Sequence, residues 1–356
     1  MPTSPRPPLW YMRADVGISP YKDKCNQQEV TMRPFELIPP IKDYIWGGTR
    51  LREEYGKVSA LDRLAESWEL SCHKDGVSVI SGGEFDGMTL TEFIAAHPEA
   101  LGKNCARFED FPVLIKLIDA RDDLSVQVHP DDAYAKRVEG GYGKTEVWYV
   151  VDCDEGAELI YGFAEETDSE TFRRAIEENT LLDIVNRVPV KKGDVFFIEA
   201  GTLHAIGRGI LIAEIQQNSN TTYRVYDYGR LGADGNPREL HIDKALDVTR
   251  CMPPTVKYGQ PQRINMAGMW RTPIAECGYF STEKFDIFRS LTVGSPDSFT
   301  HLLFLDGEAD IVYGGETVIH AKKGSSVFVP AGADTCDIKG KCSVIITKES
   351  RGGNQK

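Results

Sequence analysis

Apolar and polar residues alternate along several short segments of the chain, a pattern typical of half-buried β-strands. The segment 123–132, DLSVQVHPDD, places Gln127 and His129 two residues apart, so we expect both side chains on one face. Lys144 and Glu146 repeat this spacing in GKTEVWYVV. The pattern predicts two strands that each present a pair of polar side chains to one side.

A third alternating segment and one helical segment complete the pattern. Residues 223–227 alternate apolar with polar side chains, which predicts a strand that carries Arg224 among aromatic residues. The acidic segment 165–179 has a weak apolar stripe formed by Phe172, Ala175 and Ile176. We interpret this stripe as packing against the protein rather than as a surface for a partner.

A fourteen-residue sequence occurs twice. Residues 191–204, KKGDVFFIEAGTLH, align without gaps with residues 322–335, KKGSSVFVPAGADT. Each copy reads as a glycine turn, a short strand and a second glycine turn, which resembles the second signature of cupin domains. We therefore expect a mainly β protein built from two cupin-type double-sheet jelly rolls with a few inserted helices. His204 ends the first copy and Thr335 ends the second, so only the first barrel offers a histidine ligand there.

These patterns divide the chain into three parts. Residues 1–31 are rich in proline and contain no apolar run long enough for a signal peptide or membrane span, so we expect a disordered extension. Residues 32–250 are expected to form the metal-binding cupin domain with a helical insertion. Residues 251–356 are expected to form a degenerate cupin-like β domain without a metal site.

Composition narrows the class of protein. The 356 residues include 41 Lys and Arg against 54 Asp and Glu, and the net charge of −13 argues against general affinity for nucleic acid or anionic membranes. An anionic substrate would need a locally basic pocket. The eight cysteines form no CxxC pair, and their scatter predicts reduced thiols in a cytoplasmic protein.

Four residues form a candidate metal-ligand set: His129, Glu146, His204 and Gln127. Imidazole nitrogen with carboxylate and amide oxygen suits a borderline divalent ion such as zinc, and the lack of clustered cysteines favours an open catalytic site. Gln127 is the weaker ligand, because amides rarely bind metals and a hydrogen bond to substrate would explain it equally well. The other histidines are interpreted as structural: His73, His97, His241, His301 and His320.

Arg224 is a candidate for binding anionic oxygens. An arginine fork suits phosphate or enediolate oxygens, whereas a surface arginine paired with an acidic neighbour is the alternative interpretation. The run GGYGKT at 140–145 is similar to a phosphate-binding loop, but the first glycine of that motif would fall at Val138. We therefore reject a nucleotide-binding loop.

Six motifs, in this order, resemble those of type I mannose-6-phosphate isomerases, particularly the shorter bacterial form: IWGGTRL at 45–51, AESWELS at 65–71, DDLSVQVHPDD at 122–132, GKTEVWY at 143–149, AGTLHAI at 200–206 and QQNSNTTYRVYDYGR at 216–230. The similarity runs from Met32 essentially to the C-terminus. It implies a zinc-dependent aldose–ketose isomerase of the cupin superfamily. Such an enzyme interconverts mannose 6-phosphate and fructose 6-phosphate through a cis-enediol.

The resemblance also implies roles for individual residues. One Zn²⁺ per chain would be bound by His129, Glu146, His204 and, as a fourth ligand or near neighbour that contacts substrate, Gln127. Lys144 and Arg224 would line the pocket, Arg224 stabilising developing negative charge and Lys144 holding the phosphate or assisting proton transfer. Glu214 is our candidate for the base, although its strand position fits a structural role equally well. We expect no partner beyond the sugar phosphate, and a monomer or homodimer.

Three positions depart from the family pattern. Asn220 stands where many members have an aspartate, Gly143 where the larger enzymes have a histidine, and Glu199 where the turn usually has proline. Loss of the aspartate would reduce activity if that group were essential, and any mechanism that depends on the histidine cannot apply.

Two other functions remain open. A set of two histidines and one carboxylate also suits an iron-dependent oxygenase, although Lys144 and Arg224 argue against it. A non-catalytic sugar-phosphate sensor would bind the same ligand without turnover, and would gain support if Asn220 proved incapacitating.

Overall fold

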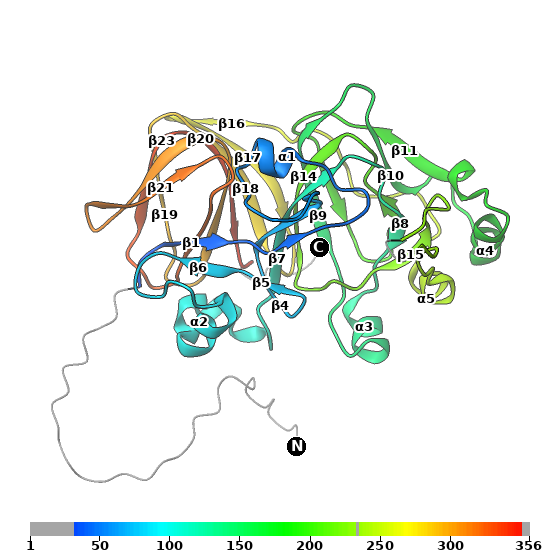
Figure 1. The fold of residues 1–356 in the computed structure, drawn as a ribbon, viewed down its shortest axis with the longest axis horizontal. Helices are drawn as coiled ribbons and strands as arrows, with labels where there is room; N and C mark the ends of the chain where they lie inside the picture. Colours follow the sequence, from blue (N-terminus) through cyan, green and yellow to red (C-terminus); the bar gives the residue numbers. More distant parts are fainter. Residues whose placement is uncertain (1–31, 233–234, 351–356) are drawn as a thin grey trace, which may run out of the picture.

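The computed structural model describes residues 32–232 and 235–350, and the expected N-terminal extension at 1–31 lies outside the described residues. Strands dominate this part of the chain and form two bodies that lie side by side (Figure 1). The green strands of Figure 1 belong to the first body and the orange and red strands to the second. The expected mainly β fold is confirmed.

The first body consists of two sheets packed on each other. The five-stranded sheet has the order β11 (Val185–Pro189), β10 (Glu158–Phe163), β13 (His204–Ala205), β8 (Val126–Val128) and β15 (Tyr223–Tyr226). The six-stranded sheet has the order β12 (Val195–Ile198), β9 (Glu146–Cys153), β14 (Ile210–Gln217), β7 (Val113–Ala120), β3 (Glu66–Leu70) and β2 (Ile41–Lys42). Side chains from both sheets share one apolar core.

Strand β7 is buried along its whole length because it separates two cores. Successive side chains of a strand point to opposite faces. Ile115 and Leu117 therefore join the core shared with the second body, whereas Ile118 and Ala120 pack inside the first body. Lys116 shares the face of Ile118, which places a buried ammonium inside the first body.

The second body is a ten-stranded sheet that includes strands from both ends of the chain. Its main path is β16 (Ile264–Met266), β17 (Met269–Glu276), β18 (Ser281–Ile287), β23 (Cys336–Lys348), β20 (Thr300–Tyr313), β22 (Ser326–Val329), β1 (Phe35–Ile38) and β6 (Val79–Ser81). Off this path, β19 (Ser290–Val293) pairs with β23 and β21 (Glu316–Lys322) pairs with β20. Two early strands thus lie in a sheet made mostly of late ones, and a domain boundary at residue 250 stays a prediction.

The sequence repeat forms equivalent turn–strand–turn units around β12 and β22. Gly193 and Gly201 flank β12 with φ of 93° and 85°, and Gly324 and Gly332 flank β22 with φ of 90° and 73°. Residues with a Cβ atom rarely adopt these positive φ values, which explains the glycine at each turn. The two copies of the repeated sequence therefore have similar backbone conformations at their glycine turns.

Helices are short and lie outside the sheets. They are α1 (Arg50–Glu53), α2 (Leu90–Ala96), α3 (Asp132–Val138), α4 (Ser169–Glu177) and α5 (Ile242–Val248), with 3-10 turns at Pro98–Leu101, Lys103–Arg107 and Leu181–Asp183. The apolar stripe of α4 is buried, so its interpretation as packing is confirmed. No helix in the described ranges is long and apolar enough to cross a membrane. The seven cysteines in these ranges are free thiols.

Candidate metal centre and substrate pocket

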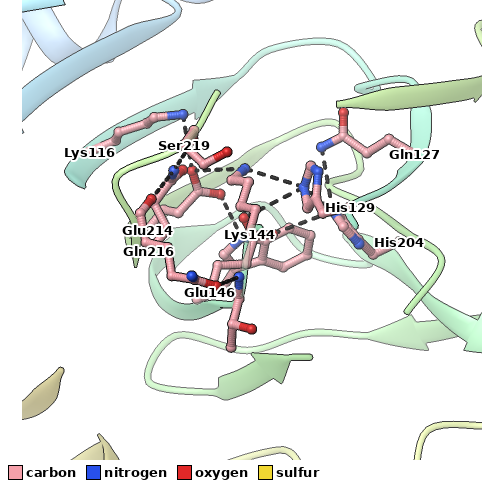
Figure 2. A network of polar contacts seen from close by, with 12 residues as sticks. Lys116, Gln127, His129, Lys144, Glu146, His204, Glu214, Gln216 and Ser219 are labelled. Atoms are coloured by element: carbon pink, nitrogen blue, oxygen red, sulfur yellow. Dashed lines mark hydrogen bonds and ion pairs between the residues drawn. The ribbon is translucent and has the colours of Figure 1, made fainter. Parts of the chain in front are cut away.

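Cross-strand pairing brings the predicted site residues together inside the first body. In the five-stranded sheet, Gln127 lies opposite His204 on one side and opposite Arg224 on the other. In the six-stranded sheet, Glu214 lies opposite Lys116. The polar side chains of the two sheets meet in the space between them (Figure 2).

His129, Glu146 and His204 form a compact, fully buried group. Their candidate ligand atoms all lie within 4.8 Å of one another. His204 Nε2 is 3.1 Å from His129 Nε2 and 3.3 Å from Glu146 Oε1. The Lys144 ammonium lies beside the group, 2.7 Å from Glu146 Oε2 and 3.2 Å from His129 Nε2. The three residues proposed as ligands are therefore brought together.

Backbone carbonyls fix the orientation of both imidazoles. His129 Nδ1 lies 2.8 Å from the carbonyl oxygen of Thr221, and His204 Nδ1 lies 2.8 Å from that of Thr202. A carbonyl can only accept a hydrogen bond, so each Nδ1 carries the proton. Burial lowers the pKa of His129 well below its usual value and that of His204 to about 4, which keeps both rings neutral. Each Nε2 therefore presents a lone pair to the centre of the group.

The donor set fits a cation. Two imidazole lone pairs and a carboxylate converge, and Glu146 Oε1 has no hydrogen-bond donor. Lys144 forms an ion pair with Glu146 Oε2 and contacts His129 Nε2, and the amide nitrogen of Gln127 lies 3.4 Å from His204 Nε2, but both Glu146 oxygens lack a hydrogen-bond donor. Buried acceptors without donors are costly, and a divalent ion would satisfy them together. The observed Nδ1 contacts are those that orient metal-binding histidines in other proteins.

Gln127 borders the metal group without belonging to its compact core. Its side-chain Nε2 lies 3.4 Å from His204 Nε2, and the residue is half-buried. Rotation of the carboxamide about its terminal bond would turn the oxygen toward the group instead. The position therefore suits both interpretations, a fourth ligand and a substrate-binding neighbour.

Lys116 and Glu214 form a second buried charge group next to Lys144. Glu214 Oε1 lies 3.2 Å from Lys116 Nζ and 3.8 Å from Lys144 Nζ, and Glu214 Oε2 accepts a hydrogen bond of 2.8 Å from Trp148. Burial alone would raise the pKa of Glu214, but Lys144, Lys116 and the Trp148 bond lower it to about 2. Burial, followed by the Glu214 charge, raises the pKa of Glu146 to about 7. Of the two carboxyls, Glu214 is the one held firmly ionised.

The backbone on both sides of Lys144 is held by a hydrogen-bond frame. The Gly143 amide donates to Asp132 Oδ1 at 2.8 Å, and the Thr145 amide donates to Gln217 Oε1 at 2.8 Å. Gln217 Nε2 also donates to Asp132 Oδ1 at 3.0 Å, which closes the frame. The hydroxyl of Tyr279, from the later part of the chain, donates to Asp132 Oδ2 at 2.7 Å. These contacts fix where the Lys144 side chain begins.

Arg224 is not neutralised by its acidic neighbour. Its Nε donates to the hydroxyl of Ser125 at 3.2 Å. Asp227 is instead bound by Arg230 at 2.6 Å and by Arg238 at 2.7 Å. Burial and then the nearby Arg238 lower the pKa of Arg224, as expected for a cation among cations. Arg230 and Arg238 thus share the Asp227 carboxylate, while Arg224 donates to the Ser125 hydroxyl and to the carbonyl oxygen of Glu239, which leaves positive charge beside the cavity.

A cavity of about 190 Å³ is lined by the Lys116–Glu214 pair and by Arg224, and it reaches the metal group through Gln127 and Lys144. Its polar lining includes Lys116, Gln127, Lys144, Glu214, Asn220, Arg224 and Arg238. Tyr44 and Trp46 supply aromatic surface. The locally basic pocket that an anionic substrate requires is therefore present despite the net negative charge of the chain.

Sequence reasoning missed Lys116 and Arg238. Lys116 is, with Asp119, one of two charged residues in the otherwise apolar strand 113–120, VLIKLIDA, and a charge in a fully buried strand requires a buried partner. That charge could have identified Lys116. Arg238 lies in a loop beyond β15, and the sequence carries no comparable signal.

Two family models match the chain. That of the type I phosphomannose isomerase catalytic domain matches residues 34–163, and that of the mannose-6-phosphate isomerase cupin domain matches residues 271–348. The two matched ranges lie mainly in the first and second bodies respectively.

This chain aligns with curated relatives over nearly their whole length. Mannose-6-phosphate isomerase ManA of Bacillus subtilis is 38% identical over 319 residues, which cover 89% of this chain and 99% of that protein. The mannose-6-phosphate isomerase of Streptococcus mutans is 38% identical over 312 residues, covering 88% and 97%.

Solved structures show the same fold. The crystal structure of mannose 6-phosphate isomerase from Bacillus subtilis aligns with a TM-score of 0.81 and 35% identity over 89% of this chain and 99% of that one. Phosphomannose isomerase from Salmonella typhimurium, at 18% identity, aligns with a TM-score of 0.72 over 90% of this chain, which supports the fold. His129, Glu146 and His204 form a candidate site for the metal cofactor that this similarity implies, and the chain belongs to the type I mannose-6-phosphate isomerase family.

Proposed function

We propose that this protein interconverts D-mannose 6-phosphate and D-fructose 6-phosphate with one Zn²⁺ per chain. The observation that carries the proposal is the convergence of three buried acceptors next to a cavity lined by four cationic side chains. We infer the identity of the substrate from the relatives named mannose-6-phosphate isomerases, which align over nearly their whole length.

His129, Glu146 and His204 would hold the zinc ion, with Gln127 as a fourth ligand or as a contact to substrate. Two neutral imidazoles and a carboxylate are a ligand set that zinc accepts in catalytic sites. When bound, the ion would polarise the substrate carbonyl or organise its hydroxyls. The backbone carbonyls that accept hydrogen bonds from Nδ1 of the two histidines would orient these ligands.

The reaction moves a carbonyl from C1 to C2 of the sugar. A proton leaves C2, a cis-enediolate forms, and a proton is returned to C1. Arg224 would stabilise the negative charge that develops on the substrate oxygens. The nearby Arg238 adds a second positive charge at this side of the cavity, which suits the same role. Lys144 and Lys116 would bind the phosphate or the enediolate oxygens from the other side of the cavity.

Glu214 would accept the proton from C2. Its pKa of about 2 keeps it in the accepting, ionised form, but a carboxylate with so low a pKa is a weak base. The proposal therefore requires substrate oxygens to compete for Lys116 and Lys144, which would raise the pKa of Glu214. Glu214→Gln should abolish exchange of the C2 hydrogen with deuterated solvent, as followed by NMR; continued exchange would remove Glu214 as the base.

Incubation of the purified protein with mannose 6-phosphate tests the proposed function. We expect fructose 6-phosphate to appear in the NMR spectrum, and the same equilibrium mixture to form from fructose 6-phosphate. Stabilisation of the fold by mannose 6-phosphate without turnover would identify a sensor. No response to either sugar phosphate would contradict the proposal.

A further inference from the structure

One hydrogen bond joins the rim of the pocket to a separate hairpin. The strands β4 (Cys72–His73) and β5 (Gly76–Val77) form this hairpin, and Asp75 lies in its turn. Asn220, in the loop between β14 and β15, donates from Nδ2 to Asp75 Oδ2 at 2.9 Å. Asn220 lines both the substrate cavity and an adjoining hollow of about 600 Å³ that Asp75 also lines.

The chemistry of the two groups sets the orientation of the amide. A carboxylate only accepts hydrogen bonds, so the NH₂ of Asn220 faces Asp75 and its carbonyl oxygen lies on the other side of the planar group. Asp75 is itself anchored, because its backbone amide donates to His73 Nδ1 at 3.1 Å and its carbonyl oxygen accepts from the Lys42 ammonium. The hydrogen bond from Asn220 is also the main cause of the lowered pKa of Asp75.

We propose that Asn220 binds a hydroxyl group of the sugar phosphate through its carboxamide and that Asp75 is the positioning residue that orients this carboxamide. The inference rests on the proposed function for the identity of the ligand. It makes a neutral amide necessary at position 220 as long as position 75 carries a carboxylate. A carboxylate at position 220 would stand at hydrogen-bonding distance from Asp75 and beside a pocket that receives a phosphate dianion.

Exchange of the two groups separates this pairing from a general effect of charge. Asn220→Asp should raise KM about tenfold and leave kcat within about threefold, because like charges at this distance repel and the rim residue is displaced. Asp75→Asn should have a small effect, because an amide oxygen can still accept from Asn220. The double variant Asp75→Asn/Asn220→Asp restores a carboxylate–amide pair, and should recover most of the KM lost in Asn220→Asp.

Glu84→Gln provides the matched control, because it removes one negative charge from an exposed side chain on the loop after β6. It should leave KM unchanged. All variants should unfold within about 2 °C of the parent, because the Asp75 side chain is 45% exposed. A wild-type KM in Asn220→Asp, or two single effects that simply add without rescue in the double variant, would overturn the pairing.

Binding of mannose 6-phosphate by calorimetry separates this inference from the proposed function. If the parent turns the sugar over, KM and Kd should follow the same order among the variants. If the parent binds without turnover, the proposed function fails, while the same order of Kd values would still support the pairing. A parent protein that does not bind mannose 6-phosphate would overturn both.

Discussion

The chemistry of the candidate site depends on which atoms carry protons. His129 and His204 keep their Nδ1 protons and donate them in hydrogen bonds to the backbone carbonyl oxygens of Thr221 and Thr202. The two Nε2 lone pairs therefore face each other across 3.1 Å. Two buried acceptors that face each other need a cation beside them; the Lys144 ammonium contacts only His129 Nε2, at 3.2 Å, whereas a divalent ion would bind both. A cation in this space would also stabilise the buried Glu146 carboxylate.

Arg224→Ala tests the proposed role of the guanidinium. We expect kcat to fall by roughly 100-fold, the size of effect seen when one donor to a developing oxyanion is removed, with metal content unchanged. Steady-state kinetics and metal analysis measure the two quantities. Arg208→Ala, at an exposed arginine outside the pocket lining, is the control. An unchanged kcat would exclude Arg224 from transition-state stabilisation.

The sequence predicted most of the residues that the structure brings together in the candidate site, but not the residues that surround them. His129, Glu146 and His204 could be identified because their residue types and spacing suit a metal. Lys116 could not be assigned a role, because the partners Glu66 and Glu214 that permit its burial are distant in sequence. The link between Asp75 and Asn220 joins two loops, and no local pattern predicts such a contact.

At the level of elements, the site depends on how the loop before β9 is held. Asp132, at the start of α3, binds the amide of Gly143, and the Lys144 amide donates to the carbonyl oxygen of Pro130 at 3.0 Å. A Cβ atom at Gly143 would lie 2.5 Å from backbone atoms of Asp131 and Asp132. This close approach explains why a larger residue is not accommodated at position 143.

Gly143→Ala should therefore disturb both the loop and the reaction. The backbone must move to admit the methyl group, and we expect a loss of about 2 kcal/mol in the free energy of unfolding, with lower kcat as Lys144 shifts. Chemical denaturation and kinetics measure the two effects. Gly141→Ala is the control, because a Cβ atom there meets nothing within 4 Å. Equal behaviour of the two variants would contradict the importance of the close approach.

The alternating segments predicted β8, β9 and β15, and the apolar stripe predicted the packing of α4. Their lengths were harder to predict, since β8 contains only Val126–Val128 and His129 lies just beyond it. Tertiary contacts set that boundary: His129 is held by the carbonyl oxygen of Thr221, in the loop before β15.

Across the whole molecule, buried polar contacts join the two bodies. Ser326 on β22 donates to the carbonyl oxygen of Glu69 on β3 at 2.7 Å, and therefore accepts from His301 Nε2 at 2.8 Å. Lys57 binds the Glu69 carboxylate and the carbonyl oxygen of Gly324. The pairing of β1 and β6 with the second body adds to this junction. The sequence could not predict the contact of Ser326 with Glu69, that of Lys57 with Gly324 or the pairing of β1 with β22, because these partners lie more than 200 residues apart.

His301 makes the stability of this junction depend on pH. Burial lowers its pKa to about 3, so it stays neutral in the folded protein, whereas the unfolded chain takes up a proton below the ordinary value of 6.5. The contribution of neutral His301 to the free energy of unfolding is fully present above pH 6.5 and is lost as the pH falls toward 3. At pH 5 the free energy of unfolding should be lower by about 2 kcal/mol for this reason.

Denaturation of His301→Gln at pH 7 and pH 5 measures this contribution. The loss of unfolding free energy between the two pH values should be about 2 kcal/mol smaller than in the parent protein. An unchanged pH dependence in His301→Gln would show that this histidine does not titrate on unfolding.

The most direct test of the account is turnover of mannose 6-phosphate by protein stripped of metal with a chelator and then titrated with zinc. We expect activity to disappear on stripping and to return fully at one zinc per chain, because His129, Glu146 and His204 form one site. His204→Ala, prepared in parallel, should bind less zinc and remain inactive. Full turnover by the metal-free protein, or by His204→Ala without zinc, would contradict the account.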